Sequence, residues 1–229
     1  IFARQGNTEE LEVVLTQLEQ ASPETGLGAF GKGRLYKEQK KYPEAVAAFD
    51  EALVREPGSV LALTEVVNTE IAMGDPDAAI KRLDAVLKDN PEHPAAHDLL
   101  GVAYAAKKDF ARAEQEFTRQ LEINPNSSVV YLQLAGARNR QGNSEGAEAA
   151  LVKGLEVLPG DTRLTVALAT FYGQQGDMDK AADVYTEALD ASPDEPRYVL
   201  SLAGIRERQK QYEKAIKLYE GFLANNTDN

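Results

Sequence analysis

Residues 94–127 read PAAHDLLGVAYAAKKDFARAEQEFTRQLEINPNS, and this stretch contains the pattern that decides the fold. Its first half repeats apolar residues at helical spacing, and its second half does the same with Ala113, Phe117 and Leu121. Asp109, between the halves, suits an N-cap because its carboxylate can accept from the free amides of the next helix. Pro125 ends the second helix, since proline has no amide donor. The stretch therefore predicts two antiparallel helices joined by a short turn.

The same pattern recurs along the chain at an interval of 34 residues. Prolines mark the interval, and so do alanines that are followed four and eight residues later by a large apolar residue. The prolines are Pro23, Pro57, Pro91, Pro125, Pro159 and Pro193, and the alanines are Ala45, Ala79, Ala113, Ala147, Ala181 and Ala215. An interval kept over most of a 229-residue chain is typical of stacked repeats rather than of one globular core.

Six full units and one partial unit follow from this spacing. Residues 1–25 are expected to supply the second helix of the partial unit. The full units are 26–59, 60–93, 94–127, 128–161, 162–195 and 196–229. We expect an all-α chain with thirteen to fourteen helices and no strand.

Small residues recur in the first helix of the units. They are Gly33, Gly101, Ala135, Ala169 and Ala203, and we expect them to face the alanine of the second helix so that the two helices can approach closely. Gly33-x-x-Tyr36 and Gly101-x-x-Tyr104, followed by the alanine, an aromatic residue and the proline, resemble the tetratricopeptide repeat (TPR) pattern. The resemblance covers essentially the whole chain.

The resemblance implies a right-handed superhelical solenoid of antiparallel helix pairs, with a concave groove lined mainly by the first helix of each pair. The regular, cysteine-free units look most like bacterial TPR scaffold proteins. The late units, with Tyr212-Glu-Lys-Ala-Ile216, resemble long TPR proteins of envelope, exopolysaccharide and protein-sorting systems.

Composition excludes several classes of function. A net charge of −12 argues against a nucleic-acid binder, which normally presents a basic surface. The absence of cysteine excludes disulfides, thiolate nucleophiles and cysteine-based zinc sites. No apolar run approaches the roughly 20 residues needed to span a bilayer, so we expect no membrane insertion by this segment. The bacterial cytoplasm and periplasm both remain open as compartments.

One histidine pair has the spacing of helical metal ligands. His93 and His97 stand four residues apart, but Pro91 and Pro94 place His93 in the turn before the helix that carries His97. We interpret His97 as a packing residue and His93 as solvated, and we expect no metal site. No phosphate-binding glycine loop or nucleophile elbow occurs, so we expect neither enzyme activity nor a cofactor.

The repeat register assigns six positions of each unit to the groove, namely the second, fifth, sixth, ninth, twelfth and thirteenth. The basic residues at these positions are Arg34, Lys37, Arg140, Arg163, Arg197 and Arg208, and the acidic ones are Glu38, Glu65, Asp98 and Glu207. The groove is therefore expected to be slightly basic in an acidic protein. The central units are instead rich in apolar groove residues: Leu61, Ile71, Ala72, Ala95, Leu99, Val102, Ala105, Ala106, Val129 and Leu132.

From these positions we predict a peptide-binding groove. Its residues are Arg34, Leu61, Asn68, Ile71, Asp98, Val102, Leu132, Arg140, Arg163, Val166, Arg197 and Arg208. The expected ligand is an extended or helical peptide with an apolar centre and acidic flanks. Two alternatives stay open: the apolar strip packs between repeats, or the arginines pair with neighbouring acids. A chaperone-tail clamp is not expected, because only Asn68 matches that pattern.

The sequence thus favours a non-catalytic scaffold that binds a protein or peptide. The alternative is a repeat domain that delivers substrate to a larger enzyme, such as a glycosyltransferase or peptidase, which sequence before Ile1 or after Asn229 would decide. We also expect end-to-end self-association of this segment. Leu218, Phe222 and Leu223 at one end, and Ile1-Phe2 at the other, have no further repeat to cover them.

Overall fold

The computed structural model describes residues 8–226, which form thirteen α-helices and no strand. The helices are α1 (Thr8–Ala21), α2 (Leu27–Glu38), α3 (Tyr42–Arg55), α4 (Val60–Ala72), α5 (Pro76–Asp89), α6 (Pro94–Ala106), α7 (Phe110–Ile123), α8 (Ser128–Arg140), α9 (Ser144–Val157), α10 (Thr162–Gln175), α11 (Met178–Ala191), α12 (Pro196–Arg208) and α13 (Tyr212–Asn225). The predicted all-α solenoid of helix pairs is confirmed. The even-numbered helices are the first helices of the six units, and the odd-numbered ones are the second helices.

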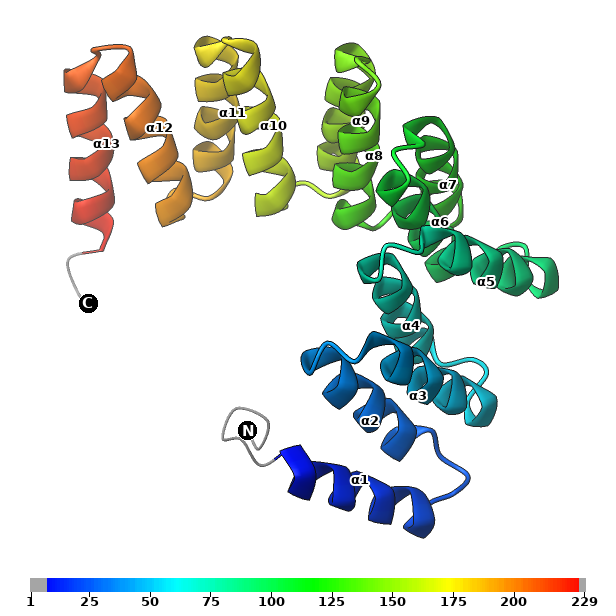
Figure 1. The fold of residues 1–229 in the computed structure, drawn as a ribbon. Helices are drawn as coiled ribbons and strands as arrows, with labels where there is room; N and C mark the ends of the chain where they lie inside the picture. The colour runs from blue at the N-terminus through cyan, green and yellow to red at the C-terminus, as the bar shows by residue number, and fades with distance from the viewer. Residues whose placement is uncertain (1–7, 227–229) are drawn as a thin grey trace. The chain divides into compact units, whose positions relative to one another are not determined.

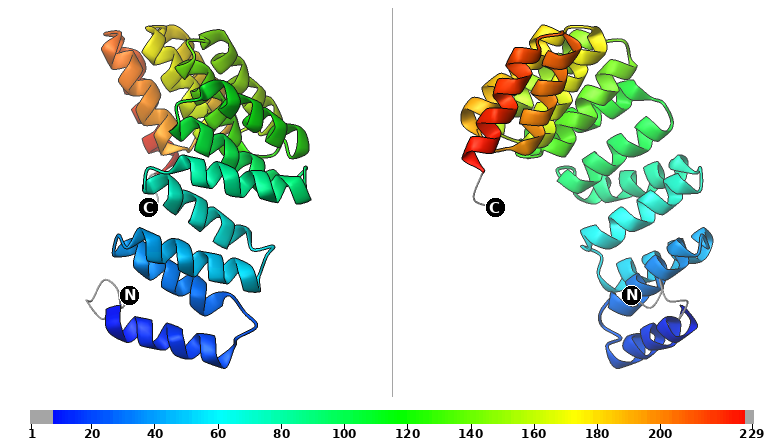
Figure 2. Two further views of the ribbon diagram at one scale, coloured as in Figure 1. Left: turned by 45° about the vertical axis from the view of Figure 1, so that its right-hand side comes forward. Right: turned by 90° about the vertical axis from the view of Figure 1, so that its left-hand side faces the viewer.

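The chain divides into two compact units, Ile1–Gln120 and Leu121–Asn229. We call them the N-terminal unit and the C-terminal unit. The boundary falls in the last turn of α7. Within each unit, consecutive helices lie side by side in chain order, as α2 with α3 and α12 with α13 (Figures 1 and 2).

The turns inside the pairs have the predicted chemistry. Asp75 caps α5, where its carboxylate accepts from the amide of Ala78 at 3.1 Å, and Asp109 accepts from Arg112 in the same way. Gly74 adopts a φ of +82°, a left-handed conformation that glycine tolerates. The equivalent residue in the unit 94–127 is Lys108, whose φ is +63°. Its backbone is therefore in the left-handed region, which is strained for a residue that has a side chain.

The alanine column is the centre of each pair. Its six residues, Ala45, Ala79, Ala113, Ala147, Ala181 and Ala215, are at most 2% exposed. A small first-helix residue lies with this column in the pair α10–α11, where Ala169 and Ala181 belong to one buried cluster. In two other pairs an aromatic ring of the second helix fills the space beside the glycine. A Cβ on Gly101 would lie 2.4 Å from the ring of Phe117, and one on Gly33 would lie 2.5 Å from the ring of Phe49.

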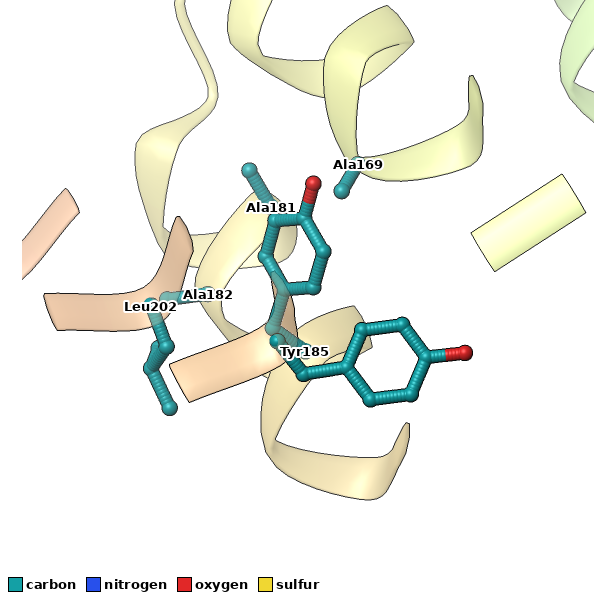
Figure 3. Packing of buried hydrophobic residues seen from close by; sticks show 6 residues of the cluster. Ala169, Ala181, Ala182, Tyr185 and Leu202 are labelled. Carbon is teal, nitrogen blue, oxygen red and sulfur yellow. The ribbon is translucent and has the colours of Figure 1, made fainter. Parts of the chain in front are cut away.

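The C-terminal unit shows how three helices share one core. Ala169 of α10, Ala181, Ala182 and Tyr185 of α11, and Tyr198 and Leu202 of α12 are buried together. Figure 3 shows Ala182 beside Leu202, and Ala169 near Ala181. The rings of Tyr185 and Tyr198 lie 6.1 Å apart between centroids. The second helix α11 is therefore packed against the first helix of its own pair, α10, and against the first helix of the next pair, α12.

A tyrosine–glutamate hydrogen bond recurs between consecutive repeats. Tyr36 of α2 donates to Glu12 of α1, and Tyr172 of α10 donates to Glu148 of α9 at 2.7 Å. The hydrogen bond to Glu12 raises the pKa of Tyr36 to about 12. Burial, followed by the hydrogen bond to Glu148, raises the pKa of Tyr172 to about 12 as well. Both units use the same polar link between one second helix and the next first helix.

Candidate functional site

All twelve predicted groove residues lie on first helices. In the N-terminal unit these are Arg34 on α2, Leu61, Asn68 and Ile71 on α4, and Asp98 and Val102 on α6. In the C-terminal unit they are Leu132 and Arg140 on α8, Arg163 and Val166 on α10, and Arg197 and Arg208 on α12. We call the surface formed by the assigned positions of the first helices the groove face, and we treat it separately in each unit.

None of the twelve is fully buried. The arginines, Leu61 and Asn68 are exposed, and Leu61 is 70% exposed, which is high for a leucine. The other residues are half-buried, and Val166 packs against the shared core of α10–α12. Leu99, by contrast, is buried, so this member of the apolar strip packs inside the fold. The strip is therefore divided between exposed and packed positions.

Charges on the groove face of the N-terminal unit pair with one another. Lys37 of α2 donates to Glu65 of α4 at 2.7 Å, which joins the first helices of two consecutive repeats. Both side chains are about 30% exposed, so the pair contributes little beyond roughly 1 kcal/mol. Arg34 has no partner among residues 8–226.

Charges on the groove face of the C-terminal unit are mostly unpaired. Arg163 is the exception, because its guanidinium meets the carboxylate of Asp161 at 3.3 Å and the hydroxyl of Ser128 at 2.5 Å. The side chains of Arg140, Arg197 and Arg208 have no partner within the described part of the chain. Three cations therefore face solvent without a neighbouring carboxylate of the protein.

The groove face of the C-terminal unit is hollowed between α10, α11 and α12. The hollow has a volume of about 500 Å³ and is lined by Ala169, Thr170, Gly173, Gln174, Met178, Ala181, Tyr185, Leu200, Ser201, Gly204, Ile205 and Arg208. We call it the α10–α12 hollow. Seven of these twelve residues occupy assigned groove positions: Thr170, Gly173, Gln174, Leu200, Ser201, Gly204 and Arg208. Its volume is within the range of ligand-binding clefts.

A larger hollow in the N-terminal unit lies elsewhere. It measures about 770 Å³ and runs along one side of α5, where it is lined by Leu53, Pro57, Gly58, Ser59, Val60, Leu63, Glu70, Ala78, Lys81, Arg82, Ala85, Val86, Asp89, Asn90 and His93. We call it the α5 hollow. None of its lining residues is an assigned groove position. The repeat register did not predict this hollow, which is lined by residues of α3, α4 and α5 and of the adjoining turns.

Arg82 fixes one part of the α5 hollow. Its guanidinium donates to Asp50 of α3 at 2.5 Å and to Glu70 of α4 at 2.6 Å, and Nε donates to Glu70 as well. Burial opposes the charge of Arg82, but the hydrogen bonds to both carboxylates raise its pKa above the ordinary value. Four of the five N–H groups of the guanidinium are engaged by the two carboxylates, so Arg82 links three helices and has little hydrogen-bonding capacity left for a ligand.

The histidine pair is structural. His97 is buried, with Nδ1 2.7 Å from a carboxylate oxygen of Glu116 and Nε2 3.0 Å from the carbonyl oxygen of Pro91. His93 is half-buried rather than solvated, because its Nδ1 caps α6 by accepting from the amide of Ala96. No cluster of three potential metal ligands occurs among residues 8–226.

Between residues 8 and 226, every helix is too short or too polar to cross a bilayer.

Comparison with known proteins gives a consistent result for fold. Sequence profiles of the tetratricopeptide repeat match residues 2–62, 67–128 and 166–229, and a second TPR profile matches residues 104–170. No curated protein matches the chain.

Solved TPR structures resemble the chain at low sequence identity. Yeast Tom70 aligns with a TM-score of 0.67 at 16% identity over 87% of this chain and 43% of its own. The C-terminal part of a TPR protein from Cytophaga hutchinsonii aligns with a TM-score of 0.64 at 18% identity over 100% of this chain and 94% of its own. A TPR protein from Parabacteroides merdae aligns with a TM-score of 0.60 at 21% identity over 97% and 88%. These likenesses concern the fold.

Proposed function

Because the chain belongs to the tetratricopeptide repeat family, we propose that it is a non-catalytic scaffold that binds a peptide segment of a partner protein on its groove face. Proteins of this family are generally scaffolds for protein–protein interaction. One observation carries the proposal for this chain: the α10–α12 hollow opens on the groove face, and most of its lining residues stand at positions assigned from the repeat register.

The exposure of apolar side chains on the groove face supports the same function. Leu61 of α4 and Leu200 of α12 are 70% and 61% exposed, although both stand on helices whose other large apolar residues are mostly packed. An exposed leucine is inexpensive by itself. Leu200, however, lines the α10–α12 hollow together with Arg208, which is unpaired among the described residues, so this part of the groove face has both an apolar and a charged group for an interface. This arrangement fits a peptide rather than a small polar metabolite.

Site-specific photo-crosslinking tests the proposal. Leu61 and Leu200 are replaced in turn by p-benzoylphenylalanine, with Val54 of α3 and Val152 of α9 as matched controls, because both valines are exposed on second helices. In native lysate, we expect positions 61 and 200 to crosslink to a partner protein that mass spectrometry can identify, and positions 54 and 152 to leave it unlabelled. Crosslinks from the second helices alone would contradict binding on the groove face.

A further inference from the structure

We propose that the α10–α12 hollow takes one aliphatic or aromatic side chain of a partner peptide, and that Arg208 pairs with a carboxylate of the same peptide. This inference rests on the proposed scaffold function and specifies the chemistry of its ligand. It concerns the C-terminal unit only.

Two glycines keep the hollow open. A Cβ on Gly173 of α10 or on Gly204 of α12 would meet no atom within 4 Å, so neither glycine is required for helix packing. Gly33 and Gly101 differ, because there a phenylalanine ring fills the space. Glycine inside a helix costs about 0.5–1 kcal/mol relative to alanine. Gly173 and Gly204 therefore lower the stability of their helices slightly, and the space beside them in the hollow stays open to a ligand side chain.

Part of the inner surface of the hollow is apolar. Ala169 and Ala181 are buried at its base with the ring of Tyr185, and Figure 3 shows the two alanines close to each other. Leu200 and Ile205 add aliphatic surface. An apolar side chain that enters this space moves from water into contact with hydrocarbon. The free energy of that transfer is favourable in proportion to the apolar area buried.

The charge at the hollow is uncompensated. Arg208 lines the hollow and is exposed, and no aspartate or glutamate is among the lining residues. The neighbouring Glu207 accepts a hydrogen bond from the hydroxyl of Tyr219 at 3.1 Å instead. Arginine presents a planar fork of donors that matches a carboxylate in two parallel hydrogen bonds. The complementary group on the ligand is therefore a carboxylate.

Polar side chains beside the apolar base suit a peptide backbone. Thr170, Gln174 and Ser201 line the same hollow and provide both donors and acceptors. A peptide has an amide and a carbonyl at every residue, so these side chains can pair with its backbone while one of its side chains fills the hollow. A free fatty acid would offer the apolar chain and the carboxylate without using them.

The test selects peptides from a phage-displayed library of random twelve-residue sequences on the immobilised protein. Selected peptides are synthesised with a fluorescent label, and their affinities are measured by anisotropy for four variants. Gly204→Leu fills the hollow, and Arg208→Gln removes the charge. The matched controls are Gly221→Leu and Lys217→Gln on α13, a second helix outside the groove face, since Gly221 also faces open space and Lys217 is also exposed and unpaired among the described residues.

We expect the selected peptides to share an apolar residue close to an aspartate or glutamate. Gly204→Leu and Arg208→Gln should each weaken binding about tenfold or more, and Arg208→Gln should also flatten the salt dependence of the affinity. The two α13 variants should bind within about twofold of the unchanged protein, and all four should keep its helical circular dichroism.

Two outcomes would overturn the inference, and they are distinguishable. If selected peptides bind but neither Gly204→Leu nor Arg208→Gln weakens them, the hollow is not the site, while peptide binding by the scaffold stands. In the second outcome, the library yields no peptide that binds, whereas a labelled caprylate probe binds the unchanged protein and binds more weakly to both Gly204→Leu and Arg208→Gln. The site would then take free fatty acids, and the proposed function would fail together with the inference.

Discussion

Arg82 in the N-terminal unit and Arg208 in the C-terminal unit both line a hollow, yet their surroundings are opposite. Arg82 donates to Asp50 and Glu70, and Glu70 is only 5% exposed. Arg208 has no partner within the described residues. The comparison distinguishes arginines that stabilise a repeat protein from arginines that can recognise a ligand. An arginine paired with carboxylates of other helices holds those helices together, whereas an unpaired arginine at an open surface is available to a ligand.

The two groove faces differ in the same sense. In the N-terminal unit, Lys37 is already paired with Glu65 of the next repeat. In the C-terminal unit, Arg140, Arg197 and Arg208 are left without a carboxylate of the described chain. Arg34 of the N-terminal unit is also unpaired among the described residues, and Arg163 of the C-terminal unit is paired, so the difference is one of number. We therefore expect acidic-ligand recognition mainly in the C-terminal unit, and apolar contact from residues such as Leu61 in the N-terminal unit.

The largest expected effect is the loss of stability in Arg82→Ala. The substitution would leave the carboxylate of Glu70 buried without a counter-charge, and breaking a pair of this kind costs about 3–5 kcal/mol. Arg208→Ala should change stability by less than about 0.5 kcal/mol, because the side chain is exposed and unpaired. Urea denaturation followed by circular dichroism measures both values.

A double variant controls for the volume lost at position 82. Arg82→Met with Glu70→Leu replaces the buried pair by apolar side chains, so it should recover most of the stability lost in Arg82→Ala. If Arg82→Ala and Arg208→Ala were equally stable, the distinction between the paired and the unpaired arginine would be wrong for this protein.

The second effect compares two glycines under the same substitution. Gly101→Ala places a Cβ 2.4 Å from Phe117, and overpacking of this kind costs about 1–3 kcal/mol. Gly173→Ala meets open space and should stabilise the fold by about 0.5–1 kcal/mol through helix propensity. Opposite signs in thermal denaturation would support the assignment of Gly101 to packing and Gly173 to the hollow.

Phe117→Leu provides the control for the first glycine. If the ring is the obstacle, adding Phe117→Leu to Gly101→Ala should cost less than Phe117→Leu costs alone, because the two changes share one space. Additive losses would indicate that the added Cβ meets something other than the ring.

Much of the fold could be predicted from the sequence because helical periodicity and the 34-residue interval act at every unit. The alanine column and the caps such as Asp75 depend on local chemistry alone. The register placed the twelve candidate residues on first helices at exposed or half-buried positions, but their role in peptide binding stays a prediction. The right-handed superhelix and the resemblance to envelope systems stay predictions, as does end-to-end association: Leu223 is exposed and Leu218 and Phe222 are half-buried, while Ile1 and Phe2 lie outside the described residues.

The two hollows could not be predicted, since they depend on how far neighbouring helices separate rather than on the residues at one position. The cluster around Arg82 had a signal that was missed. Glu70 stands at the position where Tyr36, Tyr104 and Tyr172 stand in other units. An acid at a half-buried tyrosine position requires a cation nearby, and Arg82 is the basic residue one helix further along that supplies it.

The smallest effect concerns the tyrosine–glutamate hydrogen bond that occurs between consecutive repeats in each unit, Tyr36 with Glu12 and Tyr172 with Glu148. The pKa of Tyr36 and that of Tyr172 are raised to about 12, chiefly by Glu12 in the first case and by burial with Glu148 in the second. A raised tyrosine pKa favours the neutral hydroxyl in the folded state, so the link is fully present below about pH 10 and is lost as the pH rises through 12. In an absorbance titration at about 295 nm, we expect Tyr36, Tyr172 and Tyr219 to ionise later than an unperturbed tyrosine, because the hydrogen bond to Glu207 raises the pKa of Tyr219 as well. Tyr36→Phe and Tyr172→Phe should each remove one of them. If only one variant shortened the late phase, the link would belong to one unit, and the two units would differ in their inter-repeat contacts as well as in their hollows.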